Sequence, residues 1–402
     1  MSSFAFIACS CFLMAAPPET PKAKEKENAR KQRPGRTTDV FSRLDRDSDG
    51  KVALEDLPQR ARTLFGRADT NSDGTLTRKE FEEARQRFRQ GATGMRRLAE
   101  EIDLKQDLPY AGTENPRQRL DLLLPKTPKS DKPLPVVVFI HGGGWQNGDK
   151  RSGVARVAPI VATGSYAGAS VGYRLTDEAS WPSQIHDCKA AIRWIKANAE
   201  KYHLDPERIG VIGTSAGGHL VAMLGTGGDV SALEGELGGH TGQDSRVACV
   251  VDMYGPADLL TMSQGSGAFD HDAPNSPESK LVGGPLQETK EVARDASPTT
   301  HVSSSDVPFL IIHGSEDKLV PYHQSEKLHK KLKEAGVSST LIKVRGGGHG
   351  GFRSPEVNKR IGQFFDKQLR GEEVEISDEP IVEAPREQRR QGRARQKAKA
   401  KS

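Results

Sequence analysis

Short apolar runs alternate with helical patterns over residues 104–370, and this alternation constrains the fold more than any other feature of the sequence. Each run stops at a glycine or a polar turn residue, as strands buried on both faces do. Between two runs, Pro182–Tyr202 carries apolar residues at three- and four-residue spacing, which predicts a helix. Strands alternating with helices form a mostly parallel sheet, so we predict an α/β fold with helices on both faces. The predicted strands are Val136–Ile140, Ala167–Val171, Ile209–Ile212, Ala248–Met253, Phe309–Ile312 and Leu341–Val344.

The carboxyl ends of these strands form the edge where a functional site is expected. Right-handed crossovers bring the strand ends to one edge of a parallel sheet, and ligands of open α/β sheets bind at that edge. Three motifs follow predicted strands directly, at His141–Trp145, Gly213–Gly217 and Gly346–Gly350. We therefore expect residues of these motifs to form one site.

Ser215 lies in the sequence Gly213–Gly217 (GTSAG), between a predicted strand and the predicted helix His219–Leu224. A serine on such a tight turn has strained backbone geometry, and the flanking glycines remove side chains that would clash there. The amino end of the helix directs its free amides and positive dipole end to the same place. This context predicts a nucleophilic serine; the alternative is a plain glycine-rich turn.

The sequence His141–Trp145 (HGGGW) predicts a site for a developing oxyanion. Consecutive glycines let backbone amides approach the reacting carbonyl without interference from side chains, and such donors stabilise the negative charge. We expect the hole to come from the glycine loop and the residue after the nucleophile. Its predicted residues are Gly142, Gly143, Gly144 and Ala216. We interpret His141 as a brace for the loop, and Trp145 as either a pocket wall or core.

A serine nucleophile needs a base, and the base needs an orienting acid. In this type of fold the chain order is serine, acid, histidine, which predicts Asp317 as the acid and His349 as the base. Each directly follows a predicted strand. Glu316 is a competing acid. The competing bases are His313, expected to be buried at a strand end, and His323 and His329, expected to be solvated on a helix over Pro321–Ala335; Asp187 is expected to cap or brace a loop.

Residues 104–370 resemble an α/β-hydrolase of the carboxylesterase and hormone-sensitive-lipase-like group, and within it the bacterial feruloyl and acetyl-xylan esterase branch. The motifs that carry the resemblance are HGGGW at 141–145, WPSQIHDCKAAIRWIKANAEKYHLDPERIGVIGTSAGGHL at 181–220, VVDMYGPADL at 250–259, ASP at 296–298, PFLIIHGSEDKLVP at 308–321 and GGGHG at 346–350. The resemblance implies the triad Ser215, Asp317 and His349. Related sequences act on many esters and a few amides. The polar segment Asp258–Asp306 favours small or carbohydrate-borne esters over long-chain lipids.

Two acidic loops, Asp45–Asp56 and Asp69–Glu80, each fit the twelve-residue calcium loop of an EF-hand. We predict a small all-α EF-hand-like domain that binds structural Ca²⁺. The predicted ligands are Asp45, Asp47, Asp49, Lys51 and Asp56 in loop one, and Asp69, Asn71, Asp73, Thr75 and Glu80 in loop two, with backbone carbonyls at Lys51 and Thr75. Asp56 replaces the usual glutamate, and residues 57–68 are too few for two helices, so loop one and the pairing depart from the family pattern. The alternative is a pair of solvated turns without metal.

The two ends of the chain differ in composition from its middle, and the start resembles a targeting segment. The first sixteen residues are almost free of polar side chains and end in Ala15-Ala16, which resembles a signal peptide, although no basic residue precedes them. We therefore expect an extracytoplasmic location, periplasmic or secreted. The predicted organisation is a signal peptide at 1–16, a linker at 17–38, the EF-hand-like domain at 39–90, a linker at 91–103, the hydrolase domain at 104–370 and a disordered charged tail at 371–402.

The sequence also limits the partners. The net charge of +5 comes largely from the ends, so it gives no support for nucleic-acid binding, and no apolar run reaches the ~20 residues that span a bilayer. Cys188 and Cys249 are expected to be buried thiols. We predict a serine esterase that needs no catalytic cofactor, acting through an acyl-enzyme on a small-molecule or carbohydrate ester, with its oligomeric state open. The alternatives are a calcium-dependent binding or scaffold protein on an inactive hydrolase fold, and an amidase or peptidase of the same fold.

Overall fold

A computed structural model divides the chain into two compact units, residues 1–92 and 93–402. The described residues are 40–45, 47–57, 62, 65, 68–69, 73–264 and 269–383. The predicted signal peptide, the linker at 17–38, Asn71 and the tail from 384 onward lie outside them. Among the described residues, no helix combines the length and the apolar character needed to cross a bilayer.

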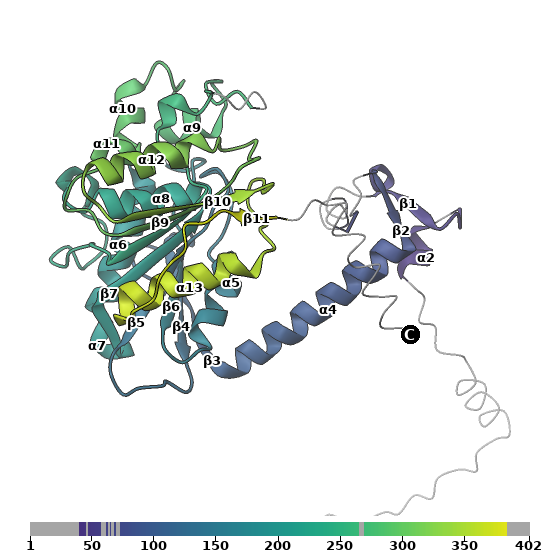
Figure 1. Ribbon diagram of the computed structural model, residues 1–402, viewed down its shortest axis with the longest axis horizontal. Helices are drawn as coiled ribbons and strands as arrows, with labels where there is room; N and C mark the ends of the chain where they lie inside the picture. Colours follow the sequence, from purple (N-terminus) through teal and green to yellow (C-terminus); the bar gives the residue numbers. More distant parts are fainter. Residues whose placement is uncertain are drawn as a thin grey trace, which may run out of the picture. The chain divides into compact units, whose positions relative to one another are not determined.

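The larger unit is built on a sheet with the strand order β11-β10-β9-β8-β7-β5-β6-β4-β3 (Figure 1). The strands are β3 (Ile102–Pro109), β4 (Arg119–Pro125), β5 (Leu134–Ile140), β6 (Ala167–Val171), β7 (Leu204–Thr214), β8 (Cys249–Met253), β9 (Phe309–Gly314), β10 (Ser339–Arg345) and β11 (Ile381–Val382). All pairs from β11 to β6 are parallel, whereas β4 is antiparallel to both of its neighbours. This confirms the predicted mostly parallel α/β fold.

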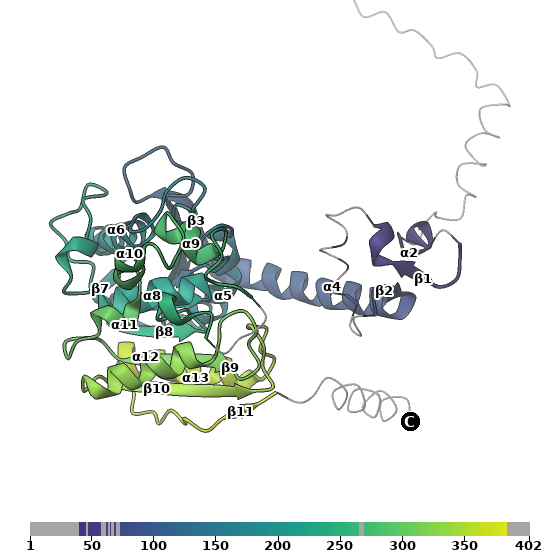
Figure 2. The same cartoon turned by 90° about the horizontal axis from the view of Figure 1, so that it is seen from above.

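Helices cover both faces of this sheet (Figure 2). They are α5 (Arg151–Val161), α6 (Ser183–Ala197), α7 (Ala199–Tyr202), α8 (Ala216–Thr226), α9 (Pro277–Val282), α10 (Lys290–Asp295), α11 (Pro298–His301), α12 (His323–Glu334) and α13 (Pro355–Arg370), with short 3₁₀ turns at η2 (Ser231–Leu233) and η3 (Leu259–Thr261). Apolar residues of α5 and α13 pack in one core cluster with alternate strand residues. Those of α6, α8 and α12 pack in the other cluster, on the opposite face.

The six predicted strands are all present, but three further strands have weak sequence signals. Strand β4 carries Asp121 at a fully buried position, which breaks the apolar run, and Lys150 neutralises this carboxylate at 2.6 Å. Strand β3 lies at the sheet edge and is largely exposed, so it has no apolar periodicity. Strand β11 has two residues. The helix predicted over 182–202 is present as α6 and α7.

The described residues beyond 370 correct the predicted start of the charged tail. Gly371 ends α13 in a left-handed conformation with φ of 69°, and the chain then returns so that β11 pairs with β10. Arg360 on α13 donates hydrogen bonds to the carbonyl oxygens of Ser377 and Glu379. Residues 371–383 therefore belong to the larger unit. Their acidic composition concealed this because isolated apolar residues such as Ile376 and Ile381, which pack in the core, form no apolar pattern.

The predicted linker at 91–103 is also different in the structure. Helix α4 (Arg78–Glu101) runs through most of it, and β3 begins directly after, at Ile102. The stretch has few apolar residues, which suggested a linker, but it is free of proline, and its Ala, Arg and Glu residues favour a helix.

The smaller unit contains the two acidic loops. Its described elements are α2 (Val40–Leu44), β1 (Lys51–Ala53), η1 (Leu54–Asp56), β2 (Thr75–Thr77) and the first part of α4. Strands β1 and β2 pair antiparallel with Val52 opposite Leu76, and both side chains are buried with Phe41 and Phe81. This short ribbon joins the two loops even though few residues separate them. Cys188 and Cys249, in the larger unit, are buried free thiols, as predicted.

Candidate active site

Ser215 lies between β7 and α8, at the carboxyl end of the central strand. Its backbone adopts φ of 55° and ψ of −122°, a conformation that costs a non-glycine residue about 1–3 kcal/mol. The turn holds this strain because the Ser215 amide donates to the Met253 carbonyl at 2.9 Å, while the Ser215 carbonyl accepts from the His219 amide at 3.0 Å. The side chain therefore projects from the sheet edge at the amino end of α8.

The two glycines of the GTSAG motif are required by close backbone packing. A Cβ atom at Gly217 would overlap the carbonyl oxygen of Ile140 on the neighbouring strand β5, and one at Gly213 would overlap the carbonyl oxygen of Gly217. No side chain fits at either position without moving backbone. The glycines thus let α8 start directly against the sheet, and this contact fixes the position of Ser215.

His349 and Asp317 complete a line of hydrogen bonds with Ser215. Nε2 of His349 lies 2.9 Å from Oγ of Ser215, and Nδ1 of His349 lies 2.7 Å from Oδ2 of Asp317. His349 follows β10 and Asp317 follows β9, so loops after three different strands bring the groups together. The His349 side chain keeps 21% of its surface exposed, whereas the Asp317 side chain is fully buried.

The environment of Asp317 favours its ionised form. Burial by itself would raise the pKa of this carboxyl group, but hydrogen bonds from His313 and His349, and from the Val320 amide, outweigh burial and hold the pKa well below its usual range. Its Oδ1 accepts from the amides of Leu319 and Val320 at 2.8 and 3.0 Å. The carboxylate is thus oriented by donors on both of its oxygens.

The glycine loop after β5 lies directly beside the serine. A Cβ atom at Gly142 would be 3.2 Å from Cβ of Ser215 and 2.5 Å from the Thr214 carbonyl oxygen. Gly143 adopts φ of 123° and Gly144 φ of 60°, values that favour glycine. Ala216 is the first residue of α8, where an amide has no partner within the helix. Of the predicted oxyanion residues, Gly142 and Ala216 therefore lie directly beside Ser215, and Gly143 and Gly144 continue the same loop.

Two neighbouring residues hold this loop in place. Nδ1 of His141 lies 2.9 Å from the Gly142 carbonyl oxygen, and the His141 ring stacks on Tyr173 with centroids 4.3 Å apart. Burial lowers the pKa of His141. Trp145 is 1% exposed and packs in the main core. Of its two predicted roles, pocket wall or core residue, the structure therefore supports the core residue. Its indole N–H donates to Nδ1 of His219 at 3.2 Å.

The competing residues do not join the line. Glu316 is exposed, and His323 and His329 are directed to the Thr261 carbonyl and the Ser339 hydroxyl oxygen. Asp187 is fully buried and accepts hydrogen bonds from Gln118 and Arg174, as a structural brace does.

His313 contacts the acid instead. Its Nε2 lies 3.2 Å from Oδ2 of Asp317. The sequence offers His313 only as an alternative base, and no local pattern indicates that it touches Asp317. Sequence reasoning also missed His219, which carries the Trp145 contact.

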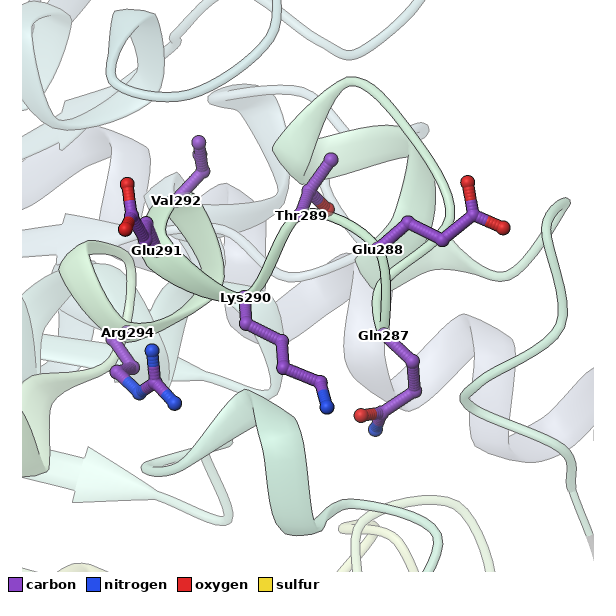
Figure 3. Close-up of a pocket in the computed structure, with 7 residues that line it drawn as sticks. All are labelled: Gln287, Glu288, Thr289, Lys290, Glu291, Val292 and Arg294. Atoms are coloured by element: carbon purple, nitrogen blue, oxygen red, sulfur yellow. The ribbon is translucent and has the colours of Figure 1, made fainter.

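The polar segment after β8 forms a wall next to the glycine loop. A Cβ atom at Gly144 would be 3.4 Å from Cβ of Pro277 on α9, and Nζ of Lys280 donates to Oε1 of Gln146 at 2.8 Å. The same segment carries a hollow lined by residues 287–292 and 294, shown in Figure 3. Its lining includes none of Ser215, Asp317 and His349, so it is not the reaction centre.

The first acidic loop has a donor set that fits calcium. One carboxylate oxygen from each of Asp45, Asp47 and Asp49 lies within 4.8 Å of the others. Oδ2 of Asp45 accepts from the Gly50 amide, while its buried Oδ1 has no hydrogen-bond partner among the described residues. Hard carboxylate oxygens gathered on one side are the ligands that Ca²⁺ prefers. Asp56 lies exposed on η1 and is not part of this cluster.

The second loop is described only in part. Asp69 accepts from the Gly74 amide, and Asp73 accepts from the amide and hydroxyl of Thr75. Glu80 closes a capping box at the start of α4, because its Oε2 accepts from the amide and hydroxyl of Thr77. The residue expected to offer a backbone carbonyl begins a paired strand in each loop: Lys51 of the first loop begins β1, and Thr75 of the second begins β2.

Comparison with known families assigns the larger unit. A family model described as BD-FAE matches residues 120–332, more than half of the chain. The chain belongs to the BD-FAE family. A second model, described as EF hand, matches residues 61–84 in the smaller unit. The BD-FAE match includes Ser215 and Asp317, whereas His349 lies beyond it.

Relatives of this BD-FAE chain include esterases. Esterase LipC from Mycobacterium tuberculosis is 35% identical over 239 residues, which cover 59% of this chain and 58% of LipC. LipM from the same organism, a probable carboxylic ester hydrolase, is 30% identical over 200 residues, covering 50% of this chain and 45% of LipM. The chain thus spans about half the length of the curated relatives that it matches.

A solved structure has a more complete correspondence. The truncated form of a carbohydrate esterase from gut microbiota superposes with a TM-score of 0.62 at 33% identity, covering 67% of this chain and 96% of that chain. Esterase B from Lactobacillus rhamnosis superposes with a TM-score of 0.57 at 22% identity, which supports the fold alone. Together with the sheet order, these likenesses show an α/β-hydrolase fold.

Proposed function

We propose that this BD-FAE chain is a carboxylic ester hydrolase with Ser215 as nucleophile, His349 as base and Asp317 as orienting acid. The observation that carries the proposal is the unbroken line from Oγ of Ser215 through the His349 ring to Oδ2 of Asp317, with contacts of 2.9 and 2.7 Å. The relatives named esterases and the solved carbohydrate esterase support the same reaction class.

The reaction begins when Nε2 of His349 takes the proton of Ser215 and Oγ attacks the ester carbonyl carbon. The positive charge that develops on the imidazole is stabilised by Asp317, which is already ionised because its donors hold its pKa down. The carbonyl oxygen becomes an oxyanion, which accepts hydrogen bonds from backbone amides of Gly143 and Ala216. Losing one such donor typically raises the barrier by about 3–4 kcal/mol.

Collapse of this tetrahedral intermediate expels the alcohol, to which the His349 imidazolium returns its proton, and leaves an acyl-enzyme on Ser215. A water molecule then attacks the acyl carbon, with His349 again as base, and the acid is released. The strained backbone of Ser215 and the rigid start of α8 keep the nucleophile in one geometry through both halves of the reaction.

We propose acetyl or feruloyl esters on polysaccharide as the substrate class. The wall next to the glycine loop is polar, since Lys280 and Gln146 bridge it, and a lipid acyl chain would need an apolar surface there. The solved relative named a carbohydrate esterase adds support. Calcium, held by Asp45, Asp47 and Asp49, would be structural. The apolar first sixteen residues support an extracytoplasmic location.

The test is a panel of acetyl-xylan, methyl ferulate and p-nitrophenyl esters of increasing chain length, assayed for wild-type protein and Ser215→Ala, with and without a chelator. We expect the acetyl and feruloyl esters to be cleaved, long-chain esters to be poor substrates, and Ser215→Ala to lose the activity by several orders of magnitude. Activity retained in Ser215→Ala would refute the mechanism. A wild-type protein that binds calcium but neither cleaves esters nor reacts with a fluorophosphonate would indicate a binding protein instead.

A further inference from the structure

A second imidazole contacts the acid of the proposed triad. His313, on β9, is fully buried, and its Nε2 lies 3.2 Å from Oδ2 of Asp317 and 2.9 Å from the Val320 carbonyl oxygen. The same Oδ2 also accepts a hydrogen bond from Nδ1 of His349, at 2.7 Å. The oxygen that orients the base therefore has a histidine on each side.

The surroundings of His313 determine which of its nitrogens carries hydrogen. Nε2 faces only acceptors, a carboxylate oxygen and a carbonyl oxygen, so it must be protonated and donate to them. Nδ1 lies 2.7 Å from Oγ of Ser325 on α12, a hydroxyl that can donate to the ring lone pair. In the neutral ring, this arrangement directs a fixed N–H at Asp317.

Aromatic contacts prevent the ring from turning away. Tyr254 packs edge-on against His313 with centroids 6.4 Å apart, and Tyr322 does so at 5.5 Å. Tyr254 also packs against His349, at 4.8 Å. One tyrosine thus contacts both imidazoles that share Asp317. The groups facing His313 are therefore two tyrosine rings, the Ser325 hydroxyl, the Val320 carbonyl oxygen and the Asp317 carboxylate.

We propose that His313 is a positioning residue of the active site: its Nε2–H holds Oδ2 of Asp317 in the plane where it accepts from Nδ1 of His349. This inference rests on the proposed function, since it assigns a role within that triad. The backbone amides of Leu319 and Val320 hold only Oδ1, so His313 is the sole described donor, other than the base itself, that directs Oδ2.

The inference predicts a specific kinetic change in His313→Leu. The carboxylate loses a donor, its plane is less restricted, and the orientation of His349 becomes less well defined. Outer partners that orient metal-ligating residues typically contribute about 10–100-fold to affinity or activity, and we expect the same scale for the partner of an orienting carboxylate. We expect kcat on p-nitrophenyl acetate to fall by about that factor, with KM within about twofold, because ester binding does not involve His313.

The matched set of variants is His313→Leu, His313→Gln and His329→Leu. Glutamine can place an amide N–H near the position of Nε2, so His313→Gln should recover most of the lost kcat. His329 is a second histidine paired with a serine hydroxyl, at 2.8 Å from Ser339, but it does not touch Asp317. His329→Leu should keep wild-type kinetics.

Two readouts separate positioning from a general effect on folding. In His313→Leu the acidic limb of the kcat/KM profile should move relative to wild type. The most downfield exchangeable proton in the NMR spectrum, from the His349–Asp317 hydrogen bond, should shift or broaden. If His313→Leu does not fold, Ser325→Ala replaces it: without its hydroxyl partner the ring is held less firmly, and kcat should fall while the melting temperature stays near wild type.

The outcomes distinguish the two proposals. A wild-type protein without Ser215-dependent esterase activity would refute the proposed function. An active wild type, with folded His313→Leu unchanged in kcat, pH profile and downfield proton, would refute the role of His313 alone. Equal losses in His313→Leu and His313→Gln, with an unmoved pH profile, would also refute it, because the N–H would then be irrelevant.

Discussion

Replacing His219 tests how burial of a neutral histidine supports the glycine loop. His219 lies on α8 and is fully buried; its Nδ1 accepts from the Trp145 indole at 3.2 Å, and its Nε2 donates to the Ala296 carbonyl at 2.6 Å. It thereby connects the glycine loop to the segment before α11. Burial lowers the pKa of His219 to about 4, from an ordinary value of 6.5.

The sign of the pH dependence follows from these values. Between pH 6.5 and 4 the unfolded chain binds a proton at this histidine and the folded chain does not, so the contribution of His219 to stability falls as the pH falls through that range. The difference corresponds to about 3 kcal/mol, most of it lost by pH 4. The contribution is fully present above pH 6.5.

The variant His219→Phe removes both hydrogen bonds and the titration. At pH 7 it leaves the Trp145 N–H and the Ala296 carbonyl unpaired, which at about 1–3 kcal/mol each predicts a loss of about 3 kcal/mol. As the pH falls to 4, the wild type loses a similar amount that the variant cannot lose. The stability difference should therefore shrink toward zero.

The assay is urea unfolding of the full chain at a series of pH values, followed by tryptophan fluorescence. All three tryptophans, at 145, 181 and 194, lie in the larger unit, so the signal reports on that unit. His329→Leu, at a half-buried site away from the glycine loop, is the control. A difference between wild type and His219→Phe that stays constant from pH 7 to 4 would refute the reasoning.

Two further predictions concern other buried or clustered acids. Burial raises the pKa of Asp252 on β8 to about 7 from 3.8, so between about pH 4 and 7 the folded protein holds a proton there that the unfolded chain releases, and the contribution of Asp252 to stability falls as the pH rises, opposite in sign to that of His219. Asp252→Asn should remove this opposing contribution, so that stability rises more steeply with pH in the same urea series, and an unchanged slope would contradict the assignment. Asp47→Ala should weaken calcium binding in isothermal titration because it removes one of three clustered carboxylates. The control Glu82→Gln, at an exposed acid outside both loops, should bind as the wild type does, and equal affinity in all three proteins would exclude the cluster as the site.

Features that depend on local spacing could be predicted from the sequence. The GTSAG motif between a strand and a helix predicted the position of Ser215, because the residue types that such a turn requires are adjacent in the chain. The acidic loops were predicted for the same reason. The order of serine, acid and histidine along the chain reduced the choice to Asp317 and His349, and the structure brings these two into one line with Ser215.

Features that depend on distant partners could not be predicted. Asp121 concealed β4 because its neutralising partner Lys150 is 29 residues away, and nothing near either residue indicates the pair. The tail after α13 gave little apolar signal, since only isolated residues such as Ile381 enter the core where β11 pairs with β10. The same limit applies to the hydrogen bond between Trp145 and His219, which are 74 residues apart.

The sequence by itself thus determined the α/β alternation, the turn at Ser215 and the two acidic loops, because each depends on residues close together in the chain. Chain order already predicted His349 as the base, but only the tertiary structure decided that His313 contacts the acid. His313 lies near the end of β9, His349 follows β10, and both have glycine neighbours, so no local pattern shows that His313 touches Asp317. Their different roles arise because loop geometry places one ring between Ser215 and Asp317 and packs the other beneath the carboxylate, between Ser325 and two tyrosine rings.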